Sequence, residues 1–468
     1  MLLAAVTGMV AALSAQSPPP GFTWQSLATG LQSGTAMAFL PDGRLLITER
    51  ATGNIRVFEN GALQAQPWAT IAVASGGSWA EQGLLGIAVD PGFLANGYVY
   101  VFYTDASGTE NRVARLREQG RFGTGLTVLT PANALPAVLY HNGGPLLFGH
   151  DGTLFVATGD ALSGSNAQDM QSWLGKVLRF DVPNLTVPAT NPFPGSAIFT
   201  LGHRNQFGLA LHPVSSSVYQ TENGSALMDE VNLLAPGGNF GWPVYEGAEP
   251  LPNPAYVDPL VVYQPTTAPT GTCFYTGEHY PLQYRHGWFF CDYNMNRLRL
   301  LTLNGAGTAV LSQVVFDQLP GSGYGVQTGP DGNLWLLTNA NGGYGANELG
   351  RYVHANESAP SAQLSSVSNK TLGGSITVCV HGGPGALAAP WLSLAQYPAP
   401  LPTPFGNLWV PMDAMLDALL CLYDERAYVG LAMPNAPAFL GASVHLQALV
   451  LTGAGLLLSN PSELVIRG

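Results

Sequence analysis

Short runs of apolar residues alternate with polar ones along most of the chain, and many of these runs come in pairs joined by a tight turn. The clearest pairs span residues 37–48, 146–158 and 326–338, and each has Asp-Gly near its centre. Asp-Gly between alternating apolar residues is a strong short-range signal for a β-hairpin. The pattern therefore predicts hairpins in these segments, and looser copies predict three more, around residues 90–104, 212–221 and 273–291.

The hairpins recur about every 50 to 70 residues, which suits a four-stranded propeller blade with variable loops. We therefore expect an all-β chain in which residues 22–354 form a six-bladed β-propeller. The alternative is an array of β-sandwiches. Helical periodicity indicates only a short helix at residues 169–173, so an α/β fold has little support.

Different segments flank this repetitive region. The apolar run within residues 1–15 is shorter than the ~20 residues of a membrane span and precedes Pro18-Pro19-Pro20. We interpret it as a signal peptide and expect a secreted or periplasmic protein without a membrane span; the alternative is an ordinary apolar arm. Residues 355–363 have the composition of a linker, and 364–468 predict a small C-terminal β-sandwich, which we expect to contact a surface or matrix.

The overall charge excludes one class of partner. Acidic residues outnumber basic ones by 29 to 17 in 468 residues, for a net charge of -12. This charge would repel phosphate backbones, so we expect no nucleic-acid binding. Four cysteines fit an exported protein: local pairing would join Cys273 to Cys291 and Cys379 to Cys421, the alternative is four buried thiols, and the absence of Cys-x-x-Cys argues against zinc.

Two stretches carry candidate catalytic groups in loops, which converge at one mouth in a propeller. In the stretch His-Asn-Gly-Gly at 141–144, the glycines let the backbone approach a ligand, and His141 can take a proton from a substrate hydroxyl. In Gly-His-Arg-Asn at 202–205, a guanidinium beside an amide can bind an oxyanion. The competing interpretations are a hydrogen-bonded histidine in a turn and an arginine paired with an acid.

Two further stretches are acidic. Residues 222–225 (Glu-Asn-Gly-Ser), together with Asp229 and Glu230, combine carboxylates with backbone carbonyls, and calcium prefers such oxygen ligands, although the spacing is not that of an EF-hand. Glu81 opens the stretch Glu-Gln-Gly-Leu-Leu-Gly at 81–86, and taken alone it also fits an edge turn that keeps a hairpin soluble.

Taken in order, these stretches resemble the soluble aldose (glucose/sorbosone) dehydrogenases that use pyrroloquinoline quinone, a family of six-bladed propellers. The resemblance covers about residues 36–352. It rests on six stretches in one order: Glu81 to Gly86, His141 to Gly144, Gly159-Asp160, Leu174 to Asp181, Gly202 to Asn205, and Asp229 to Asn232 with Asn239 to Pro243.

The resemblance implies an oxidoreductase that oxidises the anomeric hydroxyl of an aldose to a lactone, with pyrroloquinoline quinone and calcium as cofactors and an external electron acceptor. In this scheme His141 removes the hydroxyl proton, while Arg204 and Asn205 bind the oxyanion that develops on the quinone. The expected cofactor-binding residues are Glu81, Asn142, Arg204, Asn205, Arg297 and Tyr324. The expected metal ligands are Gly224, Ser225, Asp229 and Glu230.

The sequence departs from the family pattern where the three carboxylates of the cofactor are bound. The family has a lysine and two arginines at the positions that correspond here to Met295, Ser322 and Tyr324. Each charge-assisted contact contributes about 1.5 to 3 kcal/mol, so a trianion would be poorly compensated without them. Arg297 and Arg299 lie close by in the sequence and are candidates to replace the missing cations.

These departures leave two other functions open. Phe207 occupies a position where the family often has glutamine, and Glu81 one where well-known members have glutamine. The first alternative is therefore a non-catalytic secreted propeller that binds a carbohydrate or protein partner, because a fold can persist while its function changes. The second is a hydrolase that uses His141 and an acid.

Overall fold

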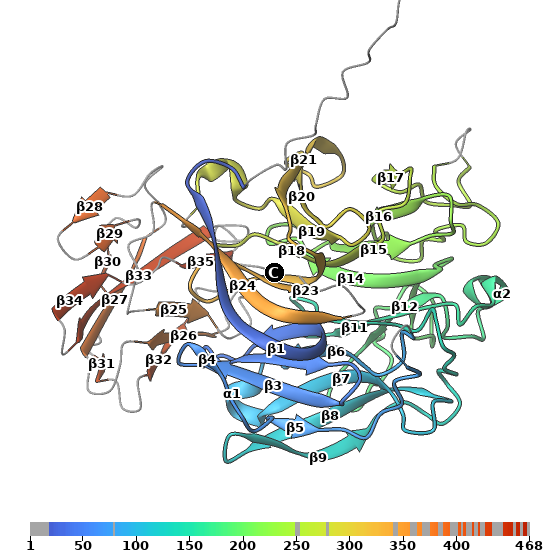
Figure 1. Ribbon diagram of the computed structural model, residues 1–468, viewed down its shortest axis with the longest axis horizontal. Helices are drawn as coiled ribbons and strands as arrows, with labels where there is room; N and C mark the ends of the chain where they lie inside the picture. Colours follow the sequence, from blue (N-terminus) through green and yellow to red (C-terminus); the bar gives the residue numbers. More distant parts are fainter. Residues whose placement is uncertain are drawn as a thin grey trace, which may run out of the picture.

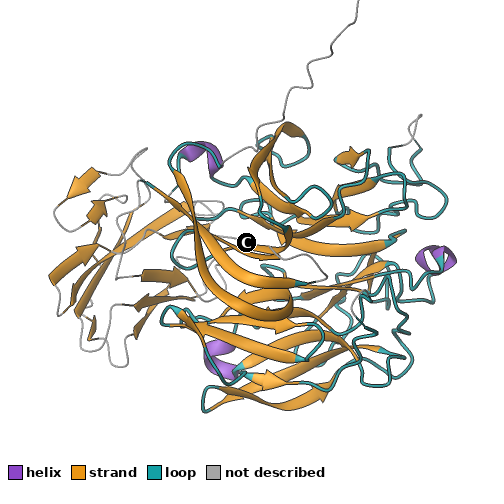
Figure 2. Cartoon of the chain, in the orientation of Figure 1, coloured by secondary structure: helices purple, strands orange, loops and turns teal. Residues whose placement is uncertain are grey.

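The computed structural model describes residues 18–355, except 78–79, 249–252, 278–279 and 340–344, and beyond them the strands between Gln363 and Val465. Almost all regular structure in this part of the chain is β-strand (Figure 2). No helix among the described residues is long and apolar enough to cross a membrane. The described helical segments are α1 (Phe93–Asn96), α2 (Gly164–Gln168) and the 3-10 helix η1 (Leu282–Tyr284).

The prediction of a helix at residues 169–173 is wrong. The helical turn α2 lies immediately before this segment, and the chain is already extended at Asp169, with φ -79° and ψ 114°. Residues 169–173 therefore form a turn rather than a helix, in which Met170 is exposed and Trp173 packs against a core cluster that contains Leu178.

Four sheets contain four antiparallel strands each, in sequence order. Their strands are β6 (Leu84–Val89), β7 (Tyr98–Thr104), β8 (Asn111–Gln119) and β9 (Phe122–Val128); β10 (Gly143–Phe148), β11 (Leu154–Thr158), β12 (Lys176–Phe180) and β13 (Ile198–Leu201); β14 (Asn205–Leu211), β15 (Val218–Asn223), β16 (Asp229–Leu233) and β17 (Val261–Tyr263); and β18 (Pro269–Phe274), β19 (Trp288–Asp292), β20 (Arg297–Leu303) and β21 (Val310–Gln318). The hairpins predicted at 146–158, 90–104, 212–221 and 273–291 all fall in these sheets.

A fifth sheet has eight strands and joins the two ends of this series. The long strand β1 pairs through its first half with β24 and through its second half with β2, so two four-stranded groups share it (Figure 1). The strands are β22 (Ser322–Thr328), β23 (Leu334–Asn339), β24 (Ala346–His354), β1 (Phe22–Phe39), β2 (Leu45–Glu49), β3 (Asn54–Glu59), β4 (Ala62–Leu63) and β5 (Ala69–Thr70).

The first strands of the successive groups form a closed ring. β1 contacts β6, β6 contacts β10, and so on through β14, β18 and β22, which contacts β1 again. Buried apolar side chains fill the spaces between neighbouring groups: Ile55 and Val101 belong to one such cluster, and Leu45 and Tyr324 to the cluster between the halves of the shared sheet. The fold is therefore propeller-like, and β1 closes the ring.

The predicted Asp-Gly hairpins are confirmed, and the backbone explains their sequence. Gly43, Gly152 and Gly332 have φ of 85°, 80° and 77°. Only glycine adopts this left-handed region at no steric cost, which is why these turns end in glycine.

A second group of strands follows in sequence and lies on the left of Figure 1. It forms sheets of three, six and two strands. Their bounds are β25 (Gln363–Ser366), β26 (Ser375–His381), β27 (Leu387–Ser393), β28 (Leu401–Thr403), β29 (Gly406–Leu408), β30 (Ala414–Met415), β31 (Leu420–Cys421), β32 (Arg426–Ala432), β33 (Ser443–Thr452), β34 (Gly455–Leu458) and β35 (Ser462–Val465). The predicted signal peptide at 1–15 and most of the predicted linker at 355–363 lie outside the described residues.

The predicted disulfide between Cys273 and Cys291 is not formed, because both residues are free thiols. Cys273 lies opposite Phe289 on the neighbouring strand, so Cys291 is its diagonal neighbour. Diagonal pairs lie about 7 to 8 Å apart, beyond the usual reach of a disulfide. Burial raises the pKa of the Cys273 thiol to about 12, which makes it unreactive. The side chains of Cys379 and Cys421 fall outside the described residues.

Candidate active site

The candidate groups lie at one end of the ring, which we call the mouth. Glu81, His141 and Arg204 each come just before an inner strand, namely β6, β10 and β14. Asp160 comes just after β11, which pairs antiparallel with β10. Because the second strand of a hairpin returns to the end where the first began, Asp160 lies beside His141.

His141 and Asp160 form a hydrogen-bonded pair with 2.7 Å between Nδ1 and a carboxylate oxygen. The Asp160 side chain is only 2% exposed and also accepts the indole N–H of Trp242 at 2.8 Å and the backbone N–H of Leu162 at 2.9 Å. An ionised carboxylate at Nδ1 favours the tautomer with the proton on Nδ1. Nε2 is then the imidazole atom that can accept a proton from a bound molecule.

The Arg204 backbone links this pair to the next sheet. Its carbonyl accepts the N–H of Asp160 at 2.8 Å, and its own N–H donates to the carboxylate of Glu222. Its guanidinium donates to the backbone carbonyls of Asn223 and Gly224 and lies over the ring of Trp242, 5.4 Å from the ring centroid. Hydrogen bonds therefore fix both the backbone and the guanidinium of Arg204 at the mouth.

A second histidine–carboxylate pair, His203 and Glu222, fixes the backbone of Arg204, because Glu222 bonds both residues. His203 Nδ1 lies 2.9 Å from a Glu222 oxygen, and its Nε2 lies 2.9 Å from the hydroxyl of Thr200. The His203 side chain is 0% exposed and stacks on Phe240. Since both ring nitrogens are engaged and no solvent reaches the ring, we assign His203 a structural role.

Glu81 and Asn205 meet beneath His141. One Glu81 oxygen accepts the backbone N–H of His141 at 2.6 Å and the side-chain amide of Asn205 at 3.0 Å, and the Asn205 oxygen accepts the N–H of Gly143 at 3.3 Å. Burial raises the pKa of Glu81, and the hydrogen bonds from Asn205 and His141 offset only part of this rise.

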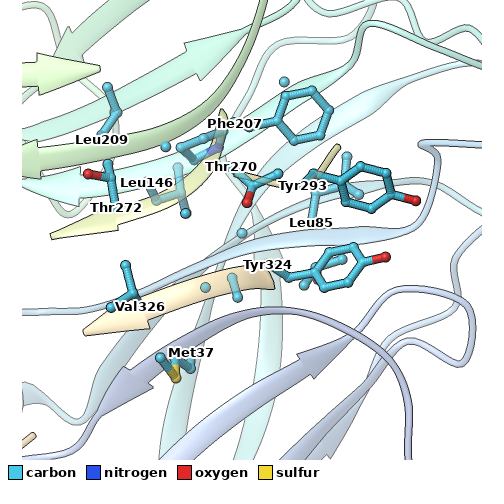
Figure 3. A pocket seen from close by; sticks show the side chains of 18 of the residues that line it. Met37, Leu85, Leu146, Phe207, Leu209, Thr270, Thr272, Tyr293, Tyr324 and Val326 are labelled. Carbon is cyan, nitrogen blue, oxygen red and sulfur yellow. The ribbon is translucent and has the colours of Figure 1, made fainter. Parts of the chain in front are cut away.

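A cavity of about 300 Å³ runs along the ring axis from this end, lined by residues of all six inner strands. Near the mouth it is lined by the rings of Phe207, Tyr293 and Tyr324, and further along the strands by apolar side chains such as Leu209 and Val326 (Figure 3). The charged side chains in the lining, within the described residues, are those of Arg50 and Glu81. The cavity is therefore mainly aromatic and apolar, with one cation.

Two of the expected cofactor-binding residues are placed elsewhere. The side chain of Asn142 is 2% exposed; it accepts from Asn111 at 2.8 Å and donates to the carbonyl of Val138 at 2.7 Å, so it holds its loop. Arg297 lies on β20, the third strand of its sheet, and donates to Gln318 at 3.3 Å. Neither residue is in the cavity lining, and the lining does not include His141, Arg204 or Asn205 either.

The missing cations are not replaced by the neighbouring arginine either. Arg299 pairs with Asp292 at 2.7 Å and lies over Tyr263. It is two residues from Arg297 on the same third strand, away from the ring of inner strands, and neither arginine is in the cavity lining. Met295 is 39% exposed in the preceding turn, whereas Tyr324 lines the cavity.

The expected metal ligands do not converge on one point. Asp229 and Glu230 are consecutive on β16, and consecutive strand residues point to opposite faces, so the two carboxylates cannot share an ion. The carbonyl of Gly224 accepts the guanidinium of Arg204, and Ser225 donates its N–H and hydroxyl to Glu246. Within the described residues there is no group of three or more His, Cys, Asp and Glu side chains arranged to hold a metal.

Asp229 and Glu230 lie in different environments. Asp229 accepts the backbone N–H groups of Gly224 at 2.9 Å and of Thr267 and Ala268 at 2.6 Å, and so ties two mouth loops together. Glu230 lies opposite Glu222, and burial together with this like charge raises the pKa of Glu230 to about 8.

The role of Asp229 leads to a stability prediction. We expect Asp229→Ala to lower the free energy of unfolding by about 3 kcal/mol or more, because three backbone N–H groups lose their acceptor. Asp229→Asn keeps one oxygen acceptor and should lose clearly less. Urea unfolding followed by tryptophan fluorescence measures both, and equal losses would contradict this role.

The sequence reasoning did not assign roles to three residues of the site, Asp160, Trp242 and Arg50, and it placed Glu222 in a candidate calcium site rather than beside His203 and Arg204. Asp160 and Arg50 follow the second strand of a hairpin, β11 and β2, and that position returns them to the mouth. A search for polar residues immediately after such strands would have found both. The contacts of Trp242 and Glu222 come from segments far apart in the sequence and have no local signal.

This ring of sheets, with a histidine–carboxylate pair and an arginine–asparagine pair at one mouth, defines a propeller-like protein of the sugar-dehydrogenase type. The family model for glucose / sorbosone dehydrogenase matches residues 31–346, and the chain belongs to this family. The predicted family is therefore confirmed.

Several relatives share most of the chain. An uncharacterized protein of Synechocystis sp. is 35% identical over 354 residues, which cover 67% of this chain and 83% of that protein. Aldose sugar dehydrogenase YliI of Escherichia coli is 28% identical over 334 residues, 66% of this chain and 87% of that protein. The structure of the PQQ-bound aldose sugar dehydrogenase of Streptomyces coelicolor matches with a TM-score of 0.60 at 27% identity, over 72% of this chain and 99% of that one.

Proposed function

We propose that the protein oxidises the anomeric hydroxyl of an aldose to a lactone, with pyrroloquinoline quinone and calcium as cofactors. The observation that carries this proposal is the His141–Asp160 pair, because the backbone N–H of His141 and the amide of Asn205 both donate to Glu81, a residue that lines the cavity. Similarity to PQQ-bound aldose sugar dehydrogenase supports it. We further propose that residues 22–354 form a six-bladed propeller and 364–468 a β-sandwich domain.

The chain's own residues have distinct tasks in this proposal. His141 Nε2 accepts the proton of the sugar hydroxyl, and Asp160 stabilises the imidazolium that results. Arg204 and Asn205 stabilise negative charge on an oxygen at the mouth. The quinone, when bound, supplies the acceptor for the hydride, and an external acceptor then takes the electrons.

The lining fits the ring system of the quinone better than its carboxylates. Phe207, Tyr293 and Tyr324 offer aromatic surfaces to a planar ligand. Asn205 and Arg204 lie outside this lining, and their donors, which bond Glu81 and the Gly224 carbonyl in the structure, would turn to a quinone oxygen. Among the described lining residues, Arg50 is the cation nearest to three carboxylates of a bound quinone, and its guanidinium already donates to the carbonyls of Ser75 and Gln82. We therefore expect this site to bind the quinone with lower affinity than a site that has three basic residues.

Calcium enters this proposal through backbone oxygens. The carbonyls of Gly224 and Ser225 are the candidate ligands, because Asp229 and Glu230 point to opposite faces of β16. Since the Gly224 carbonyl accepts Arg204 in the structure, a calcium ion there would have to share or replace that contact.

The composition of the cavity supports a second candidate function. A mainly aromatic and apolar lining with one arginine also suits a propeller that binds a carbohydrate or protein partner without redox turnover. In both cases we expect an exported protein whose C-terminal strands contact a surface or matrix.

Titration of chelator-treated protein with pyrroloquinoline quinone, with and without calcium, separates the two functions. Dye reduction against a panel of aldoses follows on the loaded protein. Calcium-dependent quinone binding with sugar-dependent dye reduction is the expected result. Absence of quinone binding at micromolar concentrations would refute the dehydrogenase function and favour the non-catalytic propeller, which glycan arrays would then test.

A further inference from the structure

Glu81 is the acidic side chain that lines the axial cavity within the described part of the chain. A carboxylate is an unusual lining group for a site proposed to bind a ligand with three carboxylates. Like charges in a poorly solvated site repel strongly, because low effective dielectric weakens screening. The cavity can therefore hold such a ligand and Glu81 together only if this repulsion is relieved.

Within the described residues, no cation forms an ion pair with Glu81. Its oxygens accept from neutral donors, the backbone N–H of His141 at 2.6 Å and the side-chain amide of Asn205 at 3.0 Å. The nearby arginines are engaged with backbone carbonyls: Arg50 donates to Ser75 and Gln82, and Arg204 to Asn223 and Gly224.

The remaining titratable group that faces Glu81 is the His141 imidazole, and this ring is bonded to the carboxylate of Asp160. Protonated His141 would attract the Glu81 anion, but the proposed reaction needs the imidazole neutral before the sugar is oxidised. Among Glu81 and the groups bonded to it, protonation of Glu81 itself is therefore the change that relieves the repulsion in the resting complex.

We propose that Glu81 takes up one proton when an anionic quinone enters the cavity and stays protonated in the complex, where it acts as a hydrogen-bond donor. The proton comes from solvent and binds the Glu81 carboxylate, so one negative charge is removed as three arrive. Glu81 thereby selects between ligands: anionic quinones bind better at lower pH, and uncharged quinones do not show this dependence. This inference rests on the proposed quinone-binding function.

The burial of Glu81 supports the proposal that quinone binding raises the pKa of this residue. Desolvation already raises the pKa of Glu81 in the free protein. The carboxylates of a bound quinone would raise it further. Proton uptake therefore occurs at pH values between the pKa of Glu81 in the free protein and its higher value in the complex. In this interval the affinity falls as pH rises, by up to about tenfold per pH unit for one coupled proton.

Calorimetric titration of the full-length protein with pyrroloquinoline quinone, in two buffers of different ionisation enthalpy, measures the proton uptake. We expect the wild-type protein to take up as much as one proton, and Glu81→Gln to take up none and bind with an affinity independent of pH. The matched control is Asp317→Asn, which alters another carboxyl whose pKa burial raises, but one that bonds Tyr352 and does not line the cavity. It should behave as wild type.

The outcomes separate this inference from the proposed function. Equal proton uptake by wild type and Glu81→Gln would overturn the inference alone. Quinone binding with Glu81-dependent uptake but no sugar oxidation would support it and reject the dehydrogenase. No binding at any pH would reject both. Infrared difference spectra of the wild-type protein on adding quinone give a second readout, and a protonated carboxyl signal that fails to appear would also overturn the inference.

Discussion

Replacement of His141 by asparagine should lower kcat for sugar oxidation by about 10²- to 10⁴-fold, the usual contribution of a general base. Asparagine is the suitable substitution because His141 has φ 58°, and asparagine tolerates this left-handed conformation better than alanine does. The backbone N–H that donates to Glu81 is retained, so the quinone site should survive. Dye-reduction kinetics at saturating quinone and sugar measure the loss.

Asp160→Asn tests the His141–Asp160 pair by changing the carboxylate instead of the imidazole. Asp160 is a positioning residue, since it acts through the Nδ1 atom of His141. An amide can turn its NH₂ group toward Nδ1 and favour the tautomer that leaves no lone pair on Nε2. We expect kcat to fall while the KM for sugar and the quinone affinity stay nearly unchanged. A His141→Asn variant that keeps a tenth of the wild-type kcat would contradict the role of His141 as general base. A fall in the kcat of Asp160→Asn that only parallels a fall in its thermal midpoint would contradict the positioning role of Asp160.

Tyr324→Arg should raise the affinity for pyrroloquinoline quinone by about 10- to 100-fold. Tyr324 lines the cavity, is 8% exposed and stands at a position where the resembled family has a basic residue. A guanidinium there can form a charge-assisted contact with a carboxylate, which contributes about 1.5 to 3 kcal/mol. Fluorescence titration of the two proteins with quinone measures the change.

The control for this charge is Leu311→Arg. Leu311 is 68% exposed on β21, the outermost strand of its sheet, so the substitution changes the net charge equally but outside the cavity. Its quinone affinity should match that of wild type. If Tyr324→Arg does not bind more tightly than Leu311→Arg, carboxylates do not reach this side of the cavity, and the missing cations are not what limits quinone binding.

Local chemistry was readable from the sequence of this protein. The Asp-Gly turns, their alternating apolar flanks and the position of His141 before a strand depend on residues close together in the chain, as do the left-handed φ values of Gly43, Gly152 and Gly332. The alternation of apolar and polar residues, together with the chemistry of the turns, therefore predicted the hairpins and the all-β class correctly. The family followed from short stretches whose order along the chain is itself a sequence property.

The tertiary structure alone decided which residues meet. β1 pairs with β24 at the far end of the propeller-like region, and Asp160 meets Trp242 across two sheets. The same packing buries Asn142 and leaves Arg297 on the third strand of its sheet, away from the cavity. The physical reason is that turns and strand periodicity are fixed by neighbouring residues, whereas the direction of a side chain relative to the ring axis depends on how whole sheets pack.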